Sequence, residues 1–190
     1  PATGEGGSAR LFADGRFATG DGRARMVPVR PKPPATPLSL GFPLSLNTGR
    51  LRDHWHTLTR TGLAPDLCRH APEPYVEIHP DDASRYGIVH DGYARITTDY
   101  GQCILKVVVS ERQQRGALFV PIHWSAMNAS HGRVGALVQS FTDPFSGQPE
   151  SKATPAAIAP YEFVFRGFAL SRKQLDLPPM VQHNTDYHGT

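Results

Sequence analysis

The residues best suited to chemistry lie in one stretch, residues 47–62, which follows the apolar run at residues 42–46. The apolar run predicts a buried strand, and the chain becomes polar and cationic directly after it. The stretch combines hydroxyls, arginines, a glycine and a tryptophan: Thr48, Thr57, Thr59, Thr61, Arg50, Arg52, Arg60, Gly49 and Trp55. Arginine matches phosphate oxygens bidentately, and a tryptophan near histidines can stack on a purine or pterin ring. The pattern favours a ligand with a diphosphate and a flat ring; the alternative is an ordinary polar loop with solvated arginines.

Length and composition limit the class of protein. A chain of 190 residues predicts one domain with ragged ends. Its 18 glycines and 18 prolines predict many turns and short strands rather than long helices. The net charge of +3 and the pI of about 9.1 are too weakly basic to indicate nucleic acid as a partner. No apolar stretch of about 18 residues occurs, so we expect no membrane-spanning helix and no membrane partner.

The cysteines and histidines do not predict a metal centre. Cys68 and Cys103 are too few and too far apart for a disulfide framework, a zinc site or an iron–sulfur site. His54 and His56 form a His-x-His pair, but no third or fourth ligand lies close by in the sequence. The chain also lacks the Gly-x-Ser-x-Gly, Gly-x-Gly-x-x-Gly and Walker patterns. These absences argue against a serine hydrolase and against a Rossmann or P-loop nucleotide site.

The sequence predicts three parts. Residues 1–37 form a turn- and proline-rich lead-in that looks like a cut inside a longer chain, with hairpin turns at two Asp-Gly pairs. Residues 38–170 form the folded body, and residues 171–190 form a polar tail. Within the body we expect a helix at residues 79–87, with His79 as its cap. We expect strands at residues 42–46, 76–78, 93–98, 103–109, 117–122 and 161–165.

Four segments occur in the order that characterises a known family. They are residues 47–62, residues 78–92 with the motif Ile78-His79-Pro80-Asp81-Asp82-Ala83, residues 119–124 with the motif Phe119-Val120-Pro121-Ile122-His123-Trp124, and residues 143–152. The chain resembles the C-terminal molybdopterin-dinucleotide-binding domain of the molybdenum oxidoreductases related to dimethyl-sulfoxide reductase. Within that family it most resembles assimilatory nitrate reductase. The resemblance covers about residues 10 to 177, and residues 11–25 resemble the segment that precedes the domain there.

This resemblance implies a fold, a cofactor and a set of site residues. The fold is mainly β with short helices, a double-psi β-barrel, and the cofactor is molybdenum bis(molybdopterin guanine dinucleotide). The implied cofactor-binding residues are Asn47, Thr48, Gly49, Arg50, Leu51, Arg52, Asp53, His54, Trp55, His56, Asn128 and Lys152. Asn128 departs from the spacing seen in periplasmic relatives. His123 and Trp124 are implied to lie near the substrate funnel, and the resemblance places no catalytic residue and no molybdenum ligand in this chain.

The implied function is that of one domain of a larger enzyme. The parent enzyme is expected to reduce nitrate to nitrite in nitrate assimilation, in the cytoplasm, with its remaining domains as the partners of this chain. Iron–sulfur cysteines are expected only in missing upstream domains, so the isolated chain should be inactive. Two alternatives stay open. The same domain could belong to a formate dehydrogenase or another oxyanion reductase, or the chain could be a non-enzymatic β-barrel binding module.

Overall fold

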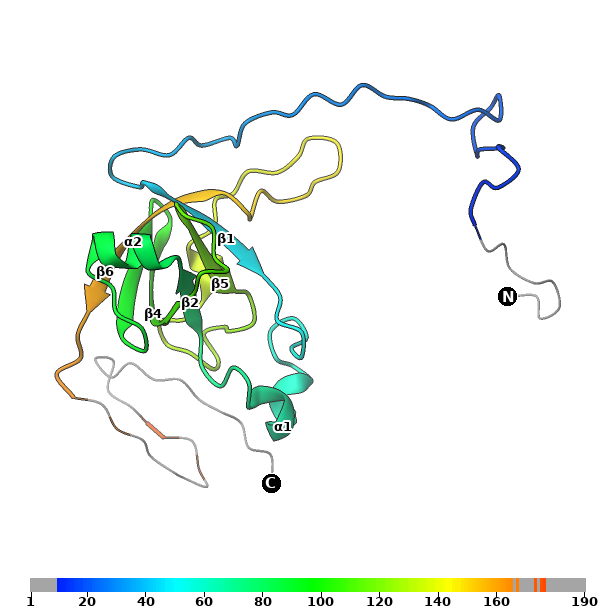
Figure 1. Ribbon diagram of the computed structural model, residues 1–190. Coiled ribbons are helices and arrows are strands. Elements are labelled where there is room, and N and C mark those ends of the chain that lie inside the picture. The colour runs from blue at the N-terminus through cyan, green and yellow to red at the C-terminus, as the bar shows by residue number, and fades with distance from the viewer. Residues whose placement is uncertain (1–9, 166, 168–172, 174, 177–190) are drawn as a thin grey trace. The chain divides into compact units, whose positions relative to one another are not determined.

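The computed structural model describes residues 10–165, 167, 173, 175 and 176 (Figure 1). The chain divides into two compact units, Pro1–Pro33 and Pro34–Thr190. Most of the polar tail predicted at residues 171–190 lies outside the described residues. Within the part that is described, no helix has the length and apolar character needed to cross a membrane.

The larger unit is a closed barrel of six strands in the order β1-β5-β2-β4-β3-β6. Two neighbouring pairs, β1 with β5 and β2 with β4, run parallel, and the remaining pairs run antiparallel. The strands are β1 (Leu44–Gly49), β2 (Tyr75–Ile78), β3 (Tyr93–Thr98), β4 (Gly101–Val109), β5 (Ala117–Pro121) and β6 (Thr154–Tyr161). Closure leaves no free sheet edge. The predicted mainly β fold of double-psi barrel type is confirmed.

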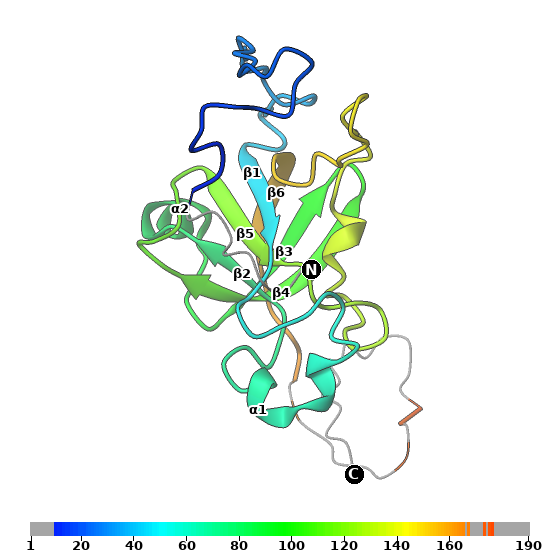
Figure 2. The same cartoon turned by 90° about the vertical axis from the view of Figure 1, so that its right-hand side faces the viewer.

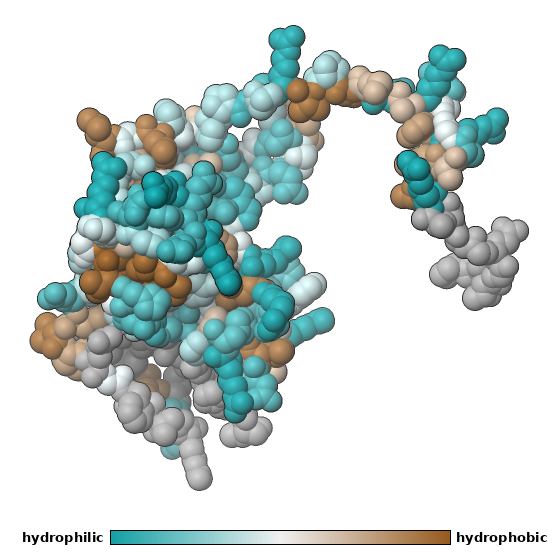
Figure 3. Space-filling view, in the orientation of Figure 1, coloured by the Kyte–Doolittle hydropathy of each residue, from teal (hydrophilic) through white to brown (hydrophobic). Residues whose placement is uncertain are grey.

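The core fills the inside of this barrel because side chains alternate between the two faces of each strand. In β1, Leu44, Leu46 and Thr48 are buried, whereas the residues between them are more exposed. The other strands supply aliphatic side chains to the same cluster, among them Val76, Ile78, Ala94, Ile96, Leu105, Val107, Leu118 and Val120. On the face of the molecule drawn in Figure 3, hydrophobic residues appear only as separate patches among hydrophilic ones.

Helix α2 (Pro80–Tyr86) shows the predicted start and stop signals. The Nδ1 atom of His79 accepts a hydrogen bond from the Asp81 amide at 3.1 Å, and Pro80 occupies the first turn. Gly87 ends the helix at a φ of 67°, a conformation that glycine adopts without strain. The predicted helix and its histidine cap are therefore confirmed. The other helices are short: α1 (Pro65–Cys68) and the 3₁₀ turns Thr61–Leu63 and Val134–Ala136.

The last strand is not where the sequence predicted it. Residues 161–165 were expected to form a strand because they alternate, but β6 is Thr154–Tyr161 and residues 162–165 are not in a strand. Two prolines, which cannot donate to a ladder, concealed the true strand. Both lie next to its ends, where Pro155 is opposite Ser45 and Pro160 is opposite Ala94. The stretch between them can therefore pair with β1 and β3.

The described part of the smaller unit, residues 10–33, consists of turns. Gly15 and Gly22 have φ values of 71° and 70°, and Asp21 Oδ1 accepts a hydrogen bond from the Arg23 amide at 3.1 Å. The turns predicted at the two Asp-Gly pairs are present, but among residues 10–33 no strands flank them. The prediction of hairpins was wrong because this segment has too few apolar residues to support a sheet.

We expect the barrel core to dominate stability. Leu118 is fully buried on β5, so Leu118→Ala should lower the free energy of unfolding by about 2 to 5 kcal/mol. Leu40 is fully exposed, so the matched variant Leu40→Ala should change it by less than about 0.5 kcal/mol. Urea unfolding of the purified chain measures both values. Equal effects of the two variants would contradict this assignment of the core.

Candidate functional site

The stretch singled out in the sequence begins inside the barrel wall, because Asn47, Thr48 and Gly49 continue β1 rather than starting a loop. There they lie opposite Phe119, Val120 and Pro121 of β5. A Cβ atom on Gly49 would lie 2.6 Å from the Phe119 ring, so a larger residue at this position would force the ring to move. Figure 2 shows β1 between β5 and β6, with its far end leading into the loop that continues to α1.

Thr48 connects this strand end to the segment that contains Lys152. Its hydroxyl donates a hydrogen bond to the carbonyl of Ser151 at 2.7 Å, and Lys152 Nζ donates to the carbonyl of Thr48. The sequence predicted that Thr48 and Lys152 bind the same ligand although they are 104 positions apart. The structure brings the two residues into direct contact. Their role in binding stays a prediction.

The loop after β1, residues 50–56, is attached to His123. The amide of Leu51 donates to His123 Nε2 at 2.8 Å, and His123 Nδ1 lies 2.6 Å from the carbonyl oxygen of His56. His123 is fully buried, and this burial lowers its pKa. A role of His123 near the substrate funnel stays a prediction. Both of its ring nitrogens contact backbone groups of this domain, those of Leu51 and His56.

The charged and aromatic side chains of this loop differ in what they contact. Arg50 is exposed. Arg52 binds the neighbouring Asp53 carboxylate through two hydrogen bonds of 2.7 Å, which raise the pKa of Arg52 and lower that of Asp53. The Trp55 ring is 55% exposed and lies edge-on to His56 at 4.6 Å. Arg50 and Trp55 are thus presented to solvent, and Arg52 is already paired with a carboxylate.

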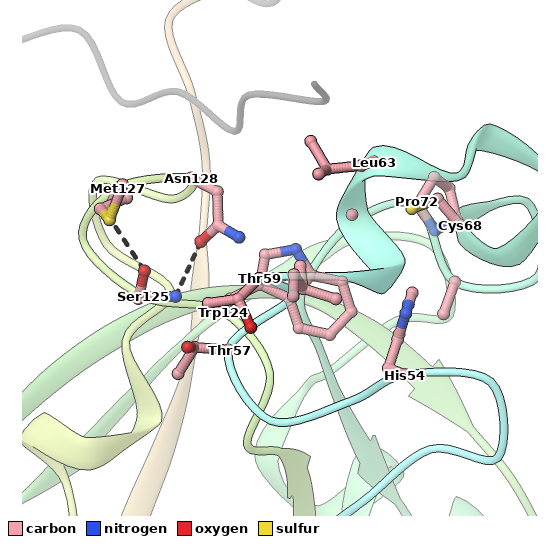
Figure 4. A pocket seen from close by; sticks show the side chains of 13 residues that line it. His54, Thr57, Thr59, Leu63, Cys68, Pro72, Trp124, Ser125, Met127 and Asn128 are labelled. Carbon is pink, nitrogen blue, oxygen red and sulfur yellow. Dashed lines mark hydrogen bonds between the residues drawn. The ribbon is translucent and has the colours of Figure 1, made fainter. Parts of the chain in front are cut away.

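A pocket of about 380 Å³ lies beside the loop (Figure 4). Its lining includes the predicted residues His54, Trp124 and Asn128, all of which are buried. Figure 4 shows the Trp124 ring among the lining side chains, with His54 next to it; the two ring centroids are 5.7 Å apart. Asn128 Oδ1 accepts a hydrogen bond from the Ser125 amide at 2.7 Å, which fixes the corner after Trp124. The pocket volume falls in the range of small-molecule sites.

His54 is the most unusual group in this pocket. Its side chain is only 6% exposed, yet neither ring nitrogen makes a hydrogen bond of ordinary length and angle. Burial lowers the pKa of His54, and the nearby Ala71 backbone offsets part of this effect. Its ring neighbours are His70 at 5.3 Å and His123 at 5.2 Å. In the described part of the chain, no three His, Cys, Asp or Glu side chains are grouped so that they could hold a metal ion.

Sequence reasoning did not assign the rest of the pocket lining. The residues without an assigned role are Thr57, Leu58, Thr59, Gly62, Leu63, Cys68, Ala71, Pro72, Ser125 and Met127. Thr57 and Thr59 are among the hydroxyls that the sequence singles out in residues 47–62. Met127 adjoins Asn128, but the apolar residues between Leu63 and Pro72 carry no local signal, because only the tertiary fold brings them to Trp124.

Comparison with known proteins identifies the family. Residues 44–155 match the family described as "Molydopterin dinucleotide binding domain". The chain therefore belongs to the molybdopterin dinucleotide-binding domain family. It is 46% identical over 158 residues to a nitrate reductase of Klebsiella oxytoca, an alignment covering 83% of this chain and 18% of that protein. It is 31% identical over 156 residues to the assimilatory nitrate reductase catalytic subunit of Bacillus subtilis, covering 81% of this chain and 21% of that protein.

The chain thus spans about a fifth of the length of these curated relatives. Among solved structures, acetylene hydratase from Pelobacter acetylenicus matches with a TM-score of 0.55 at 18% identity. That match covers 63% of this chain and 18% of the hydratase chain, and it supports the fold alone. Membership in the family establishes a molybdopterin-type cofactor as the ligand class of this domain.

The two buried histidines predict an acid-sensitive domain. In the folded chain the pKa values of His54 and His123 lie below the ordinary histidine value of about 6.5. At a pH between the lowered and the ordinary pKa, the unfolded chain therefore binds more protons than the folded chain. Their contribution to stability is complete above about pH 6.5 and is lost as the pH falls through the lowered pKa values. Urea unfolding between about pH 5 and pH 8 should show this decrease. His54→Leu should flatten the curve, and an unchanged slope would contradict the role of His54.

Proposed function

We propose that this chain holds the guanine-dinucleotide part of a molybdopterin guanine dinucleotide, as one domain of a nitrate reductase. The observation that carries the proposal is the convergence of three segments at one end of the barrel. They are the end of β1 with the loop at residues 50–56, the corner at residues 123–128, and the segment of Ser151 and Lys152. Every residue transferred from the family lies in one of these segments.

The donors in these segments fit a diphosphate. Arg50 is an exposed guanidinium that can bind two phosphate oxygens at once. The Lys152 ammonium has three N–H donors and gives one to the Thr48 carbonyl, which leaves donors for an anionic ligand. Arg52 suits this role less well because Asp53 already occupies its planar edge. The fit therefore rests on Arg50 and Lys152.

The pocket and the exposed tryptophan fit flat heterocycles. Guanine and pterin rings carry donors and acceptors on their edges, and the unpartnered nitrogens of buried His54 offer one of each when the ring is neutral. Trp55 presents an exposed ring on which such a heterocycle can stack. When bound, the cofactor supplies the molybdenum and its redox chemistry, and the chain supplies binding, orientation and electrostatics.

The nitrate reductases to which the chain is similar over four-fifths of its length support nitrate as the substrate. We propose that the rest of such an enzyme provides the molybdenum ligand and an iron–sulfur cluster. In the described residues Cys68 and Cys103 are not in a disulfide, and Cys103 is buried in the barrel, so the two do not form a cluster site together.

Arg50 should contribute strongly to cofactor retention. In the enzyme that contains this chain, Arg50→Ala should weaken binding of the molybdopterin by about 2 to 5 kcal/mol, because a buried phosphate oxygen loses its charged partner. Molybdenum content and pterin fluorescence after dialysis measure this loss. Arg95→Ala is the matched control, since Arg95 is an exposed arginine on β3 that contacts the Tyr161 ring. If Arg50→Ala and Arg95→Ala retain equal amounts of molybdenum, Arg50 does not bind the cofactor.

The substrate can be tested with reduced viologen as the electron donor. We expect the enzyme that contains this chain to reduce nitrate, and the purified 190-residue chain with added cofactor to give no turnover above a heat-killed control. The reason is that one wall of the site leaves the cofactor facing water, where charged hydrogen bonds are weaker. Formate oxidation without nitrate reduction would show that the enzyme containing this chain is a formate dehydrogenase and not a nitrate reductase. Turnover by the chain alone would show that it is a complete enzyme.

A further inference from the structure

The His123 ring joins the two ends of the loop at residues 51–56. One ring nitrogen contacts the amide of Leu51 and the other contacts the carbonyl of His56. Just before this point, the Ile122 amide donates to the Gly49 carbonyl at 2.9 Å and continues the pairing of β1 with β5. Beyond the last backbone hydrogen bond between the extensions of β1 and β5, the His123 side chain therefore connects the two segments.

The chemistry of these two partners determines the position of the ring proton. A carbonyl oxygen can only accept, so Nδ1 must carry the hydrogen that is donated to His56. A backbone amide can only donate, so Nε2 must offer a lone pair to Leu51. A single neutral form, with the proton on Nδ1, satisfies both contacts. The protonated ring and the opposite tautomer each place an N–H against the Leu51 N–H.

The loop needs such a restraint because its backbone is strained. His56 has a φ of 43° and Leu58 has a φ of 65°, in the left-handed region that residues with side chains rarely adopt. The carbonyl that His123 binds belongs to His56. The peptide that His123 holds at this end adjoins Trp55, and the amide that it holds at the other end, that of Leu51, adjoins Arg50.

We infer that His123 is a positioning residue: its neutral imidazole, with the proton on Nδ1, fixes residues 51–56 in the conformation that presents the cofactor-binding side chains. This inference rests on the proposed function for the role of the loop, but the contact itself can be tested without cofactor. The titratable and charged groups that face the ring are Arg50, His54, His56 and His70. Each of them, when positively charged, opposes a proton on His123, so the neutral ring persists until the solution is acidic.

The first test uses the purified 190-residue chain and nuclear magnetic resonance. The ring nitrogen shifts of His123 should be those of a neutral imidazole protonated on Nδ1, at neutral pH. In His123→Ala, the Leu51 amide should exchange with solvent at least about tenfold faster, while the amides of Leu105 and Val107 in β4 keep their protection. His90→Gln is the control: His90 also accepts a hydrogen bond from a backbone amide, that of Val109, but its side chain is exposed.

A pH series on the unsubstituted chain keeps the test decisive if His123→Ala does not fold. Exchange at Leu51, corrected for the intrinsic effect of pH, should rise as His123 becomes protonated, with β4 unchanged. The inference would be overturned if the ring were the Nε2–H tautomer, or if the exchange rate of the Leu51 amide did not change when His123 is protonated. Either result would leave the proposed function intact. Absence of molybdopterin from the enzyme that contains this chain would overturn the proposed function, whereas equal retention by Arg50→Ala and Arg95→Ala would only remove Arg50 from the cofactor site. Neither result affects the contact between His123 and the loop.

Discussion

The parallel pairing of β1 with β5 is the constraint on which the rest of the site depends. Parallel strands end at the same edge, so the loop after β1 and the corner after β5 must meet there. Strand β6 runs antiparallel to β1, with Thr154 opposite Leu46, so the segment just before β6 arrives at the same end. Because the barrel is closed, strand order brings these segments to one end, and the hydrogen bonds of Thr48 and His123 then hold the loops in position there.

Buried polar groups at this end divide into two kinds. Thr48 and His123 are buried and have their hydrogen bonds satisfied within the chain, which gives the loops defined positions. His54 is also buried, but neither ring nitrogen has a partner. An unsatisfied buried polar group costs about 1 to 3 kcal/mol, so a native domain contains few of them. The contrast separates residues that hold the site in place from one that is available to a ligand.

Sequence patterns predicted those features that depend on neighbours along the chain. The helix at residues 80–86 was found because His79 and Gly87 act on adjacent backbone groups. Strands β3 and β4 were found because each is a run of strand-forming residues next to a short turn. Strand β6 was missed because its prolines are incompatible with a ladder unless both lie near the strand ends. The residues of the three segments were named through family resemblance. The contacts of His123 with His56 and Leu51 could not be predicted, because these residues are separated from it by 67 and 72 positions and only the fold brings them together.

The barrel strands and the loop that follows β1 differ in local stability. The core strands bury a single cluster of aliphatic side chains. The loop contains the buried His54 and the left-handed His56, and the left-handed Leu58 follows shortly after it. Each of these local features raises the free energy of the loop by about 1 kcal/mol or more, so the loop is the first part expected to open. A ligand that supplies hydrogen bonds to His54 and charge to Arg50 stabilises this weakest segment and adds little to the barrel. Binding therefore changes the order of the loop more than the fold around it.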